Sequence, residues 1–153
     1  MKWKHPPIIK IYEALGVVAD ERIEMSGDTA KISSSSGNKF YDVTYDQENN
    51  AIMANDNSSY WQGSLGYPAI AYLLKIGVLE YKQELGSLLK DIAWKDINQK
   101  FKNNFDKSLN YILSNLDIGK RSRLEKYAGE LGSKIKELNL GIFGKKVLPP
   151  SGY

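Results

Sequence analysis

The chain has 153 residues, of which 42% are hydrophobic and 25% charged, which is typical of a folded globular domain and excludes a disordered segment. Cysteine is absent, which excludes disulfides, thiolate nucleophiles and metal sites built on cysteine. The net charge of +3 is unevenly distributed, because residues 1–89 carry 8 Lys/Arg and 11 Asp/Glu whereas residues 90–153 carry 13 and 7.

The first predicted element is a helix of about ten residues that begins after Pro6-Pro7, since proline suits the first turn of a helix. Gly16 is well placed to end it. From Arg22 to Asn55 the apolar residues alternate with polar ones, and clusters of Gly, Asn and Asp interrupt the alternation. Short alternating runs of this kind predict an antiparallel meander of three or four strands with one buried face.

The segment from Asn55 to Pro68 carries two large aromatic residues, Tyr60 and Trp61, among amides, hydroxyls and glycines. Segments between regular elements often hold binding residues. In one interpretation the two rings stack on a ligand while Asn57 and neighbouring amides hydrogen-bond to it. In the other, Trp61 caps the core and the amides satisfy the backbone of the turn.

The remaining chain is predicted to be helical. One helix begins at Pro68 and ends near Gly77, and a second covers Leu85 to Ile92. The longest apolar run, from Tyr67 to Leu79, is only about 13 residues and contains Lys75, too short to cross a bilayer. With no apolar run near the N-terminus that resembles a signal sequence, we expect a cytoplasmic protein with no membrane segment.

Two further helices are predicted in the basic half. Apolar residues recur every three or four positions from Trp94 to Leu116, which predicts one long amphipathic helix flanked by lysines. In the last helix, apolar residues at 4-3-4-3 spacing form a short two-heptad seam: Leu124, Ala128, Leu131, Ile135 and Leu138. This seam either joins copies of the chain into a homo-oligomer or packs on the core of its own domain.

We therefore predict an α+β fold, with a small antiparallel sheet of three or four strands packed with helices and a helical C-terminal region. Residues 1–116 form the predicted α/β binding domain, and residues 117–153 form the C-terminal helix and basic tail.

Catalytic chemistry is poorly supported. His5 is the only histidine, so neither a histidine dyad nor a histidine metal cluster can form. The run from Ser33 to Lys39 resembles a phosphate loop, but it lacks the first glycine, has Phe40 where a hydroxyl should bind Mg²⁺, and joins two predicted strands. Such a polar hairpin tip can still contact a phosphate through its backbone and Lys39. We expect no enzyme activity, no metal and no cofactor.

Seventeen aromatic residues, ten of them tyrosine, beside a basic half favour binding of unpaired nucleic acid, because bases stack on rings while ammonium groups contact phosphates. The predicted stacking residues are Tyr41, Tyr45, Tyr60 and Trp61, and the predicted phosphate contacts are Lys39, Lys95, Lys100 and Lys102. Single-stranded DNA is the favoured ligand, and single-stranded RNA fits the same residues. Two alternatives are an adaptor that docks on a protein through its helical half, and an enzyme or small-ligand site at Asn55–Gly66.

The layout resembles the archaeal ThermoDBP-type single-stranded DNA-binding proteins. Residues 6–116 look like the compact α/β binding domain of that family, and the seam from Leu124 to Leu138 looks like its C-terminal assembly helix. The cysteine-free composition rich in Lys, Ile and Asn is compatible with such a source. The resemblance implies a hydrophobic cleft edged by basic residues, binding of single-stranded DNA, and self-association through the last helix.

Overall fold

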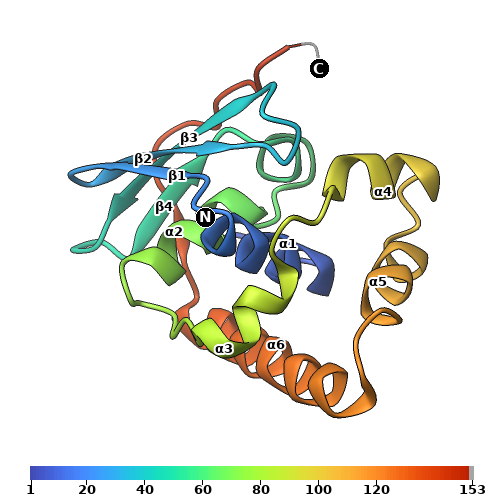
Figure 1. Cartoon of the computed structure of the whole chain (residues 1–153). Helices are drawn as coiled ribbons and strands as arrows, with labels where there is room; N and C mark the ends of the chain where they lie inside the picture. Colours follow the sequence, from blue (N-terminus) through green and yellow to red (C-terminus); the bar gives the residue numbers. More distant parts are fainter. Residues whose placement is uncertain (152–153) are drawn as a thin grey trace.

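The alternating residues between Ile23 and Ala54 form four antiparallel strands, as predicted, in a computed structural model that describes residues 1–151. These strands are β1 (Ile23–Ser26), β2 (Thr29–Ser33), β3 (Phe40–Asp46) and β4 (Ala51–Ala54), and they lie side by side in chain order. A short fifth strand, β5 (Gly141–Ile142), pairs parallel to β4 at the edge of the sheet. The structure confirms the α+β class, with helices gathered against the sheet (Figure 1).

The strand register decides which side chains enter the core. Ile32 pairs with Tyr41, and Tyr45 pairs with Ile52, so these residues share the face of the sheet that the helices cover. The opposite face carries polar residues such as Lys31 and Asp42, whose charged atoms lie 3.7 Å apart in solvent. In β2 and β3, alternation therefore separates a buried face from an exposed one, as expected, whereas all four residues of β4 are buried.

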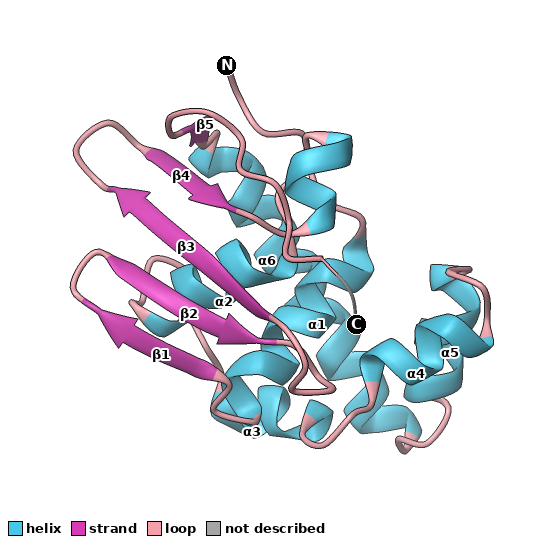
Figure 2. Cartoon of the chain, turned by 90° about the horizontal axis from the view of Figure 1, so that it is seen from above, coloured by secondary structure: helices cyan, strands magenta, loops and turns pink. Residues whose placement is uncertain are grey.

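Two helices supply most of the packing on the sheet. Helix α1 (Ile8–Ala19) and helix α2 (Tyr67–Lys75) lie against each other and against the buried strand residues. Figure 2 shows both helices beneath the sheet. Helix α1 continues beyond its predicted end at Gly16, which lies inside the helix and leaves room for Trp94. Between β4 and α2, residues Ser58–Gln62 form a π-helical turn, η1.

The predicted long helix from Trp94 to Leu116 is wrong, because the structure divides it into α4 (Trp94–Lys100) and α5 (Phe105–Leu113). Lys102 and Asn103 both have positive φ values, 52° and 61°, which no continuous α-helix allows. Asn104 then caps α5 by accepting a hydrogen bond from the backbone N–H of Lys107. The predicted lysine rows along one helix are therefore interrupted.

The last long helix, α6 (Ile118–Leu138), packs on α1 and on the short helix α3 (Gln83–Gly86), which the 3₁₀ turn η2 (Ser87–Leu89) follows. Four seam residues are buried in the chain's own core, namely Leu124, Ala128, Leu131 and Ile135. The fifth, Leu138, is partly buried and packs against that core. Of the two predicted roles of the seam, these positions fit packing on the core of its own chain, and self-association stays a prediction. The two predicted parts, divided near residue 116, share one hydrophobic core.

Within residues 1–151, no helix combines the length and apolar character needed to cross a membrane.

Candidate functional site

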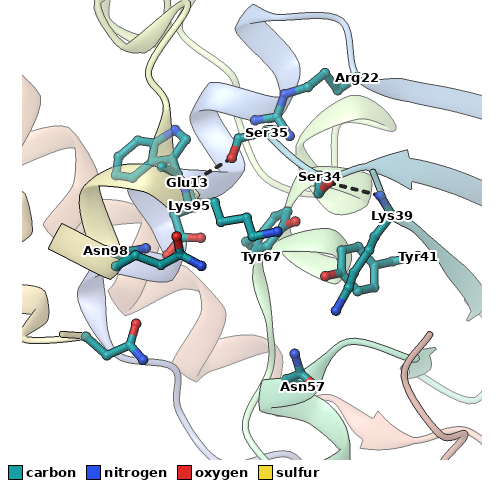
Figure 3. Close-up of a pocket in the computed structure, with 13 residues that line it drawn as sticks. Glu13, Arg22, Ser34, Ser35, Lys39, Tyr41, Asn57, Tyr67, Lys95 and Asn98 are labelled. Atoms are coloured by element: carbon teal, nitrogen blue, oxygen red, sulfur yellow. Dashed lines mark hydrogen bonds between the residues drawn. The ribbon is translucent and has the colours of Figure 1, made fainter. Parts of the chain in front are cut away.

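An open cavity of about 340 Å³ lies where the β2–β3 hairpin tip, helix α1, helix α4 and the η1 segment meet. This volume is at the lower end of the range for small-molecule sites. Its lining is almost entirely polar or aromatic and comes from segments far apart in the sequence (Figure 3). The lining residues used below are Glu13, Arg22, Ser34, Ser35, Lys39, Tyr41, Asn57, Tyr67, Trp94, Lys95 and Asn98.

The hairpin tip forms one wall of the cavity. Ser34 and Lys39 close the tip, because the N–H of Ser34 donates to the Lys39 carbonyl at 2.9 Å and the N–H of Lys39 donates to Ser34 Oγ at 3.2 Å. The neighbouring Ser35 hydroxyl accepts a hydrogen bond of 3.2 Å from the backbone N–H of Lys95. This last contact holds the start of α4 against the tip, so the wall and the helix are positioned together.

Glu13 places a carboxyl group in the cavity from helix α1. The residue is only 5% exposed, and its Oε1 atom has no hydrogen-bond partner among the described residues. Lys10 Nζ lies 3.5 Å from Oε1, an ion-pair distance without hydrogen-bond geometry. Burial raises the pKa of the Glu13 carboxyl, and Lys10 opposes the rise only in part. The group therefore tends toward its neutral acid form more than an exposed glutamate does.

Two other lining residues carry buried polar atoms without partners among residues 1–151, the Asn98 amide oxygen and the Trp94 indole nitrogen. The indole nitrogen faces helix α1, since a Cβ built at Gly16 would lie 2.7 Å from it. Asn98 lies beside Glu13 on the α1–α4 side of the cavity (Figure 3). Glu13 and Asn98 thus present two hydrogen-bonding oxygens to this side.

Tyr41 and Tyr67 meet edge to face on the sheet side of the cavity, with ring centroids 6.0 Å apart. Burial raises the pKa of both phenols, that of Tyr67 well above its usual value. Both therefore stay protonated at neutral pH and offer neutral hydroxyl groups. Arg22 is held by its own contacts, because its Nε lies 3.3 Å from Asp20 and its Nη1 donates to the Ser33 carbonyl at 2.6 Å.

Asp56, which is 4% exposed, holds the η1 turn in place through hydrogen bonds. Its carboxylate accepts hydrogen bonds from the Ser59 hydroxyl at 2.5 Å and the Ser59 N–H at 3.4 Å. Gly66 makes room for this carboxylate, because a Cβ there would overlap it. The turn places Asn57 in the cavity lining and leaves Trp61 68% exposed. Trp61 therefore does not cap the core, and its ring meets Tyr60 edge to face at 4.7 Å.

The structure brings together three of the eight predicted binding residues, Lys39, Tyr41 and Lys95, in this cavity. Tyr60 and Trp61 lie in the adjacent η1 turn. Tyr45 is 9% exposed and packs edge to face on Tyr72. Tyr41 lines the cavity but is itself 7% exposed and packs edge to face on Tyr67. Neither ring offers an open stacking face, so the predicted stacking role is wrong for both.

The last two predicted contacts lie at the end of α4. Lys100 Nζ lies over the Tyr111 ring, 4.4 Å from its centroid, and Lys102 is in the turn that separates α4 from α5. Neither residue lines the cavity.

Three lining residues that matter for the geometry of the site, Glu13, Tyr67 and Asn98, were not among the eight predicted binding residues. Glu13 had a readable signal, since it is a charged residue between the apolar residues Tyr12 and Leu15 of a predicted helix. Tyr67 and Asn98 had none, because an aromatic before a helical proline and an asparagine in a basic helix both suit ordinary surfaces. Among the described residues, no group of three or more His, Cys, Asp or Glu residues could hold a metal ion.

A family model described as "Uncharacterised conserved protein UCP014422" matches residues 3–141, which is most of the chain. The chain belongs to this family. The match spans every element from α1 to α6 and therefore includes the whole cavity. No curated protein and no solved structure gives a significant match. The family description names no ligand or activity, so the proposal below rests on the geometry of the cavity.

Proposed function

We propose that this protein binds single-stranded nucleic acid without catalysing a reaction, and that one nucleotide of the strand enters the cavity. The observation that supports this most is the meeting of Lys39, Tyr41 and Lys95 in one open cavity. These residues come from the β2–β3 hairpin tip, β3 and α4, and the cavity also includes Asn57, which directly precedes the η1 turn that carries the exposed Trp61.

Phosphate binding is assigned to the two lysines. Arg22 is held by Asp20 and the Ser33 carbonyl, and Lys39 and Lys95 are the other two cationic residues of the lining. Ammonium groups bind nucleic acid phosphates with release of counterions, which makes the affinity depend on salt. The hairpin tip that carries Lys39 also has the hydroxyls of Ser34 and Ser35, which suit phosphate oxygens.

Base stacking outside the cavity is assigned to Trp61. Its ring is largely exposed, and it belongs to the same turn as the lining residue Asn57. A π-helical turn is uncommon and often marks a functional site. A base adjacent to the nucleotide in the cavity can stack on this ring, and such stacking contributes about 1–3 kcal/mol per base.

The test is fluorescence anisotropy with a labelled single-stranded DNA of roughly 20 nucleotides at low salt. We expect saturable binding, with a weaker affinity for duplex of the same length. Trp61→Ala should weaken binding about 5- to 150-fold through lost stacking. The double change Lys39→Ala and Lys95→Ala should reduce the log–log salt slope by about 1.4, because each lost phosphate contact removes about 0.7.

Two control variants remove similar side chains from elsewhere. Lys75→Ala changes an exposed lysine at the end of α2, and Ile118→Ala removes an exposed apolar side chain at the start of α6. Both should leave the affinity unchanged. Absence of saturation, or equal affinity for duplex and single strand, would refute the proposal.

A further inference from the structure

We infer that the buried side of the cavity selects nucleobases that carry an exocyclic amino group, with Glu13 and Asn98 as the specificity-determining residues. This inference rests on the proposed function and adds the class of base that the site accepts. It is carried by two buried oxygens, Glu13 Oε1 and Asn98 Oδ1, which have no hydrogen-bond partner among residues 1–151 and belong to residues that line the cavity from α1 and α4.

The two oxygens require hydrogen-bond donors from a ligand. Glu13 Oε1 and Asn98 Oδ1 are buried and have no hydrogen-bond partner among residues 1–151. Leaving such atoms unpaired is unfavourable, so buried polar groups of this kind usually indicate a ligand or a functional role. Both residues line the same cavity, and they lie on the side opposite Lys39 (Figure 3).

The charges around Glu13 itself disfavour a phosphate next to its carboxyl group, whereas Lys95 of α4 and Lys39 of the hairpin are the cationic residues assigned to phosphate. The charged groups that face Glu13 are Lys10 on its own helix, Arg22 after that helix, and Asp56 before η1. Lys10 is 3.5 Å from the Glu13 carboxyl and Arg22 is held by Asp20, so neither leaves an exposed cationic centre there. A carboxyl oxygen and an amide oxygen repel phosphate oxygens. The nucleotide is therefore oriented with its base toward Glu13 and Asn98 and its phosphate toward Lys39.

The edges of the bases differ in the donors that they present. Cytosine and adenine have an amino group beside a ring nitrogen acceptor, and guanine has an amino group beside a ring N–H. A carboxyl oxygen accepts from the cytosine amino group, and asparagine pairs with the adenine edge. Thymine and uracil have no exocyclic amino group and present a single ring N–H between two carbonyl oxygens, so they can donate to only one of the two oxygens, Glu13 Oε1 or Asn98 Oδ1. Unpaired polar groups are the strongest source of discrimination in a binding pocket.

The experiment compares labelled oligo(dC), oligo(dA) and oligo(dT) of equal length by anisotropy, with the full chain. We expect the dC and dA strands to bind about tenfold more tightly than dT, the effect of one well-formed base contact. Glu13→Met removes the carboxyl while keeping its length, and Asn98→Leu removes the amide. Each should reduce the preference to about twofold or less without changing the salt slope, because neither residue contacts phosphate.

Glu137→Met is the matched control, since Glu137 is an exposed carboxylate on α6 that should leave the preference intact. Thermal unfolding of each variant checks that it folds, and Asn98→Leu keeps the test decisive if Glu13→Met does not fold. Equal affinity for dC and dT strands, or a tenfold preference that survives both variants, overturns the base selection while leaving nucleic acid binding in place. Failure of every strand to bind overturns the proposed function as well.

Discussion

Glu13 is an acid on a face of α1 that otherwise consists of apolar residues. Its neighbours Ile9, Tyr12 and Gly16 are all buried, and its carboxyl forms an ion pair with Lys10. Burying an ionised carboxyl without hydrogen bonds is unfavourable. Groups that lower stability in this way are typical of binding sites, where function requires them. The position of Glu13 is therefore better explained by what it binds than by what it stabilises.

The raised pKa of Glu13 predicts how stability changes with pH. Because the folded protein holds the proton more tightly than the unfolded chain does, the free energy of unfolding falls as pH rises through the Glu13 pKa. Glu13→Gln removes this titration. We expect the variant to be at least as stable as the native protein near pH 7 and to lose that advantage below about pH 4, where an unfolded glutamate is protonated.

Urea unfolding between about pH 4 and pH 7 measures this difference. Asp46→Asn serves as the control, because the pKa of this exposed carboxyl is lowered by hydrogen bonds to Asn49 and its removal should act in the opposite direction. A native protein that gains stability relative to Glu13→Gln as pH rises would contradict the prediction.

Which of the predicted binding residues are exposed was the feature of the site hardest to predict from the sequence. Alternation correctly placed Tyr41 and Tyr45 on one face of β3, but it does not say whether helices cover that face. In the structure the helices cover this face of the sheet, so Tyr45 is buried against Tyr72 and Tyr41 lies at the cavity. Trp61 was predicted both as a stacking residue and as a core cap, and only its three-dimensional surroundings separate the two.

At the scale of elements, the sequence predicted the meander and the helix at Pro68 because both have clear periodicity and turn residues. It did not predict the break between α4 and α5. Apolar spacing continues through the break, whereas the interruption comes from the backbone of Lys102 and Asn103. Consecutive asparagines, which tolerate positive φ and cap helices, were the available signal.

The contact between α1 and α4 predicts opposite effects for two glycine substitutions. Gly16→Ala places a methyl group 2.7 Å from the Trp94 indole nitrogen and 3.4 Å from the Leu89 carbonyl, so Trp94 at the start of α4 must shift. We expect a loss of about 1–3 kcal/mol in unfolding free energy. Gly129→Ala, in α6, meets nothing within 4 Å and should increase stability by about 1 kcal/mol.

Urea unfolding measures both changes, and oligonucleotide affinity gives a second readout. Gly16→Ala should weaken binding because Lys95 and Asn98 move with α4, whereas Gly129→Ala should leave binding unchanged. If both substitutions stabilised the protein equally, the close contact between Trp94 and α1 at Gly16 would be contradicted.

At the scale of the whole molecule, the seam of α6 shows what a heptad pattern leaves open. Apolar residues at 4-3-4-3 spacing pack equally well on a partner helix or on a core of the same chain. Here α1 and α3 occupy that face, and β5 attaches the segment after α6 to the sheet. The cavity was likewise not predictable from the sequence, because its lining comes from segments far apart in the chain that no local sequence pattern connects.

Burial of the seam predicts that it stabilises the monomer. Leu131 is 3% exposed in the core, whereas Ile118, in the same helix, is 88% exposed. Leu131→Ala should therefore lower the free energy of unfolding by about 2–5 kcal/mol, and Ile118→Ala should change it by no more than about 0.5 kcal/mol. Chemical denaturation measures the difference, and light scattering should give the same mass for both variants as for the native chain. A fall in mass for Leu131→Ala with unchanged monomer stability would instead mean that the seam joins two chains, and that helix α6 leaves the core to do so.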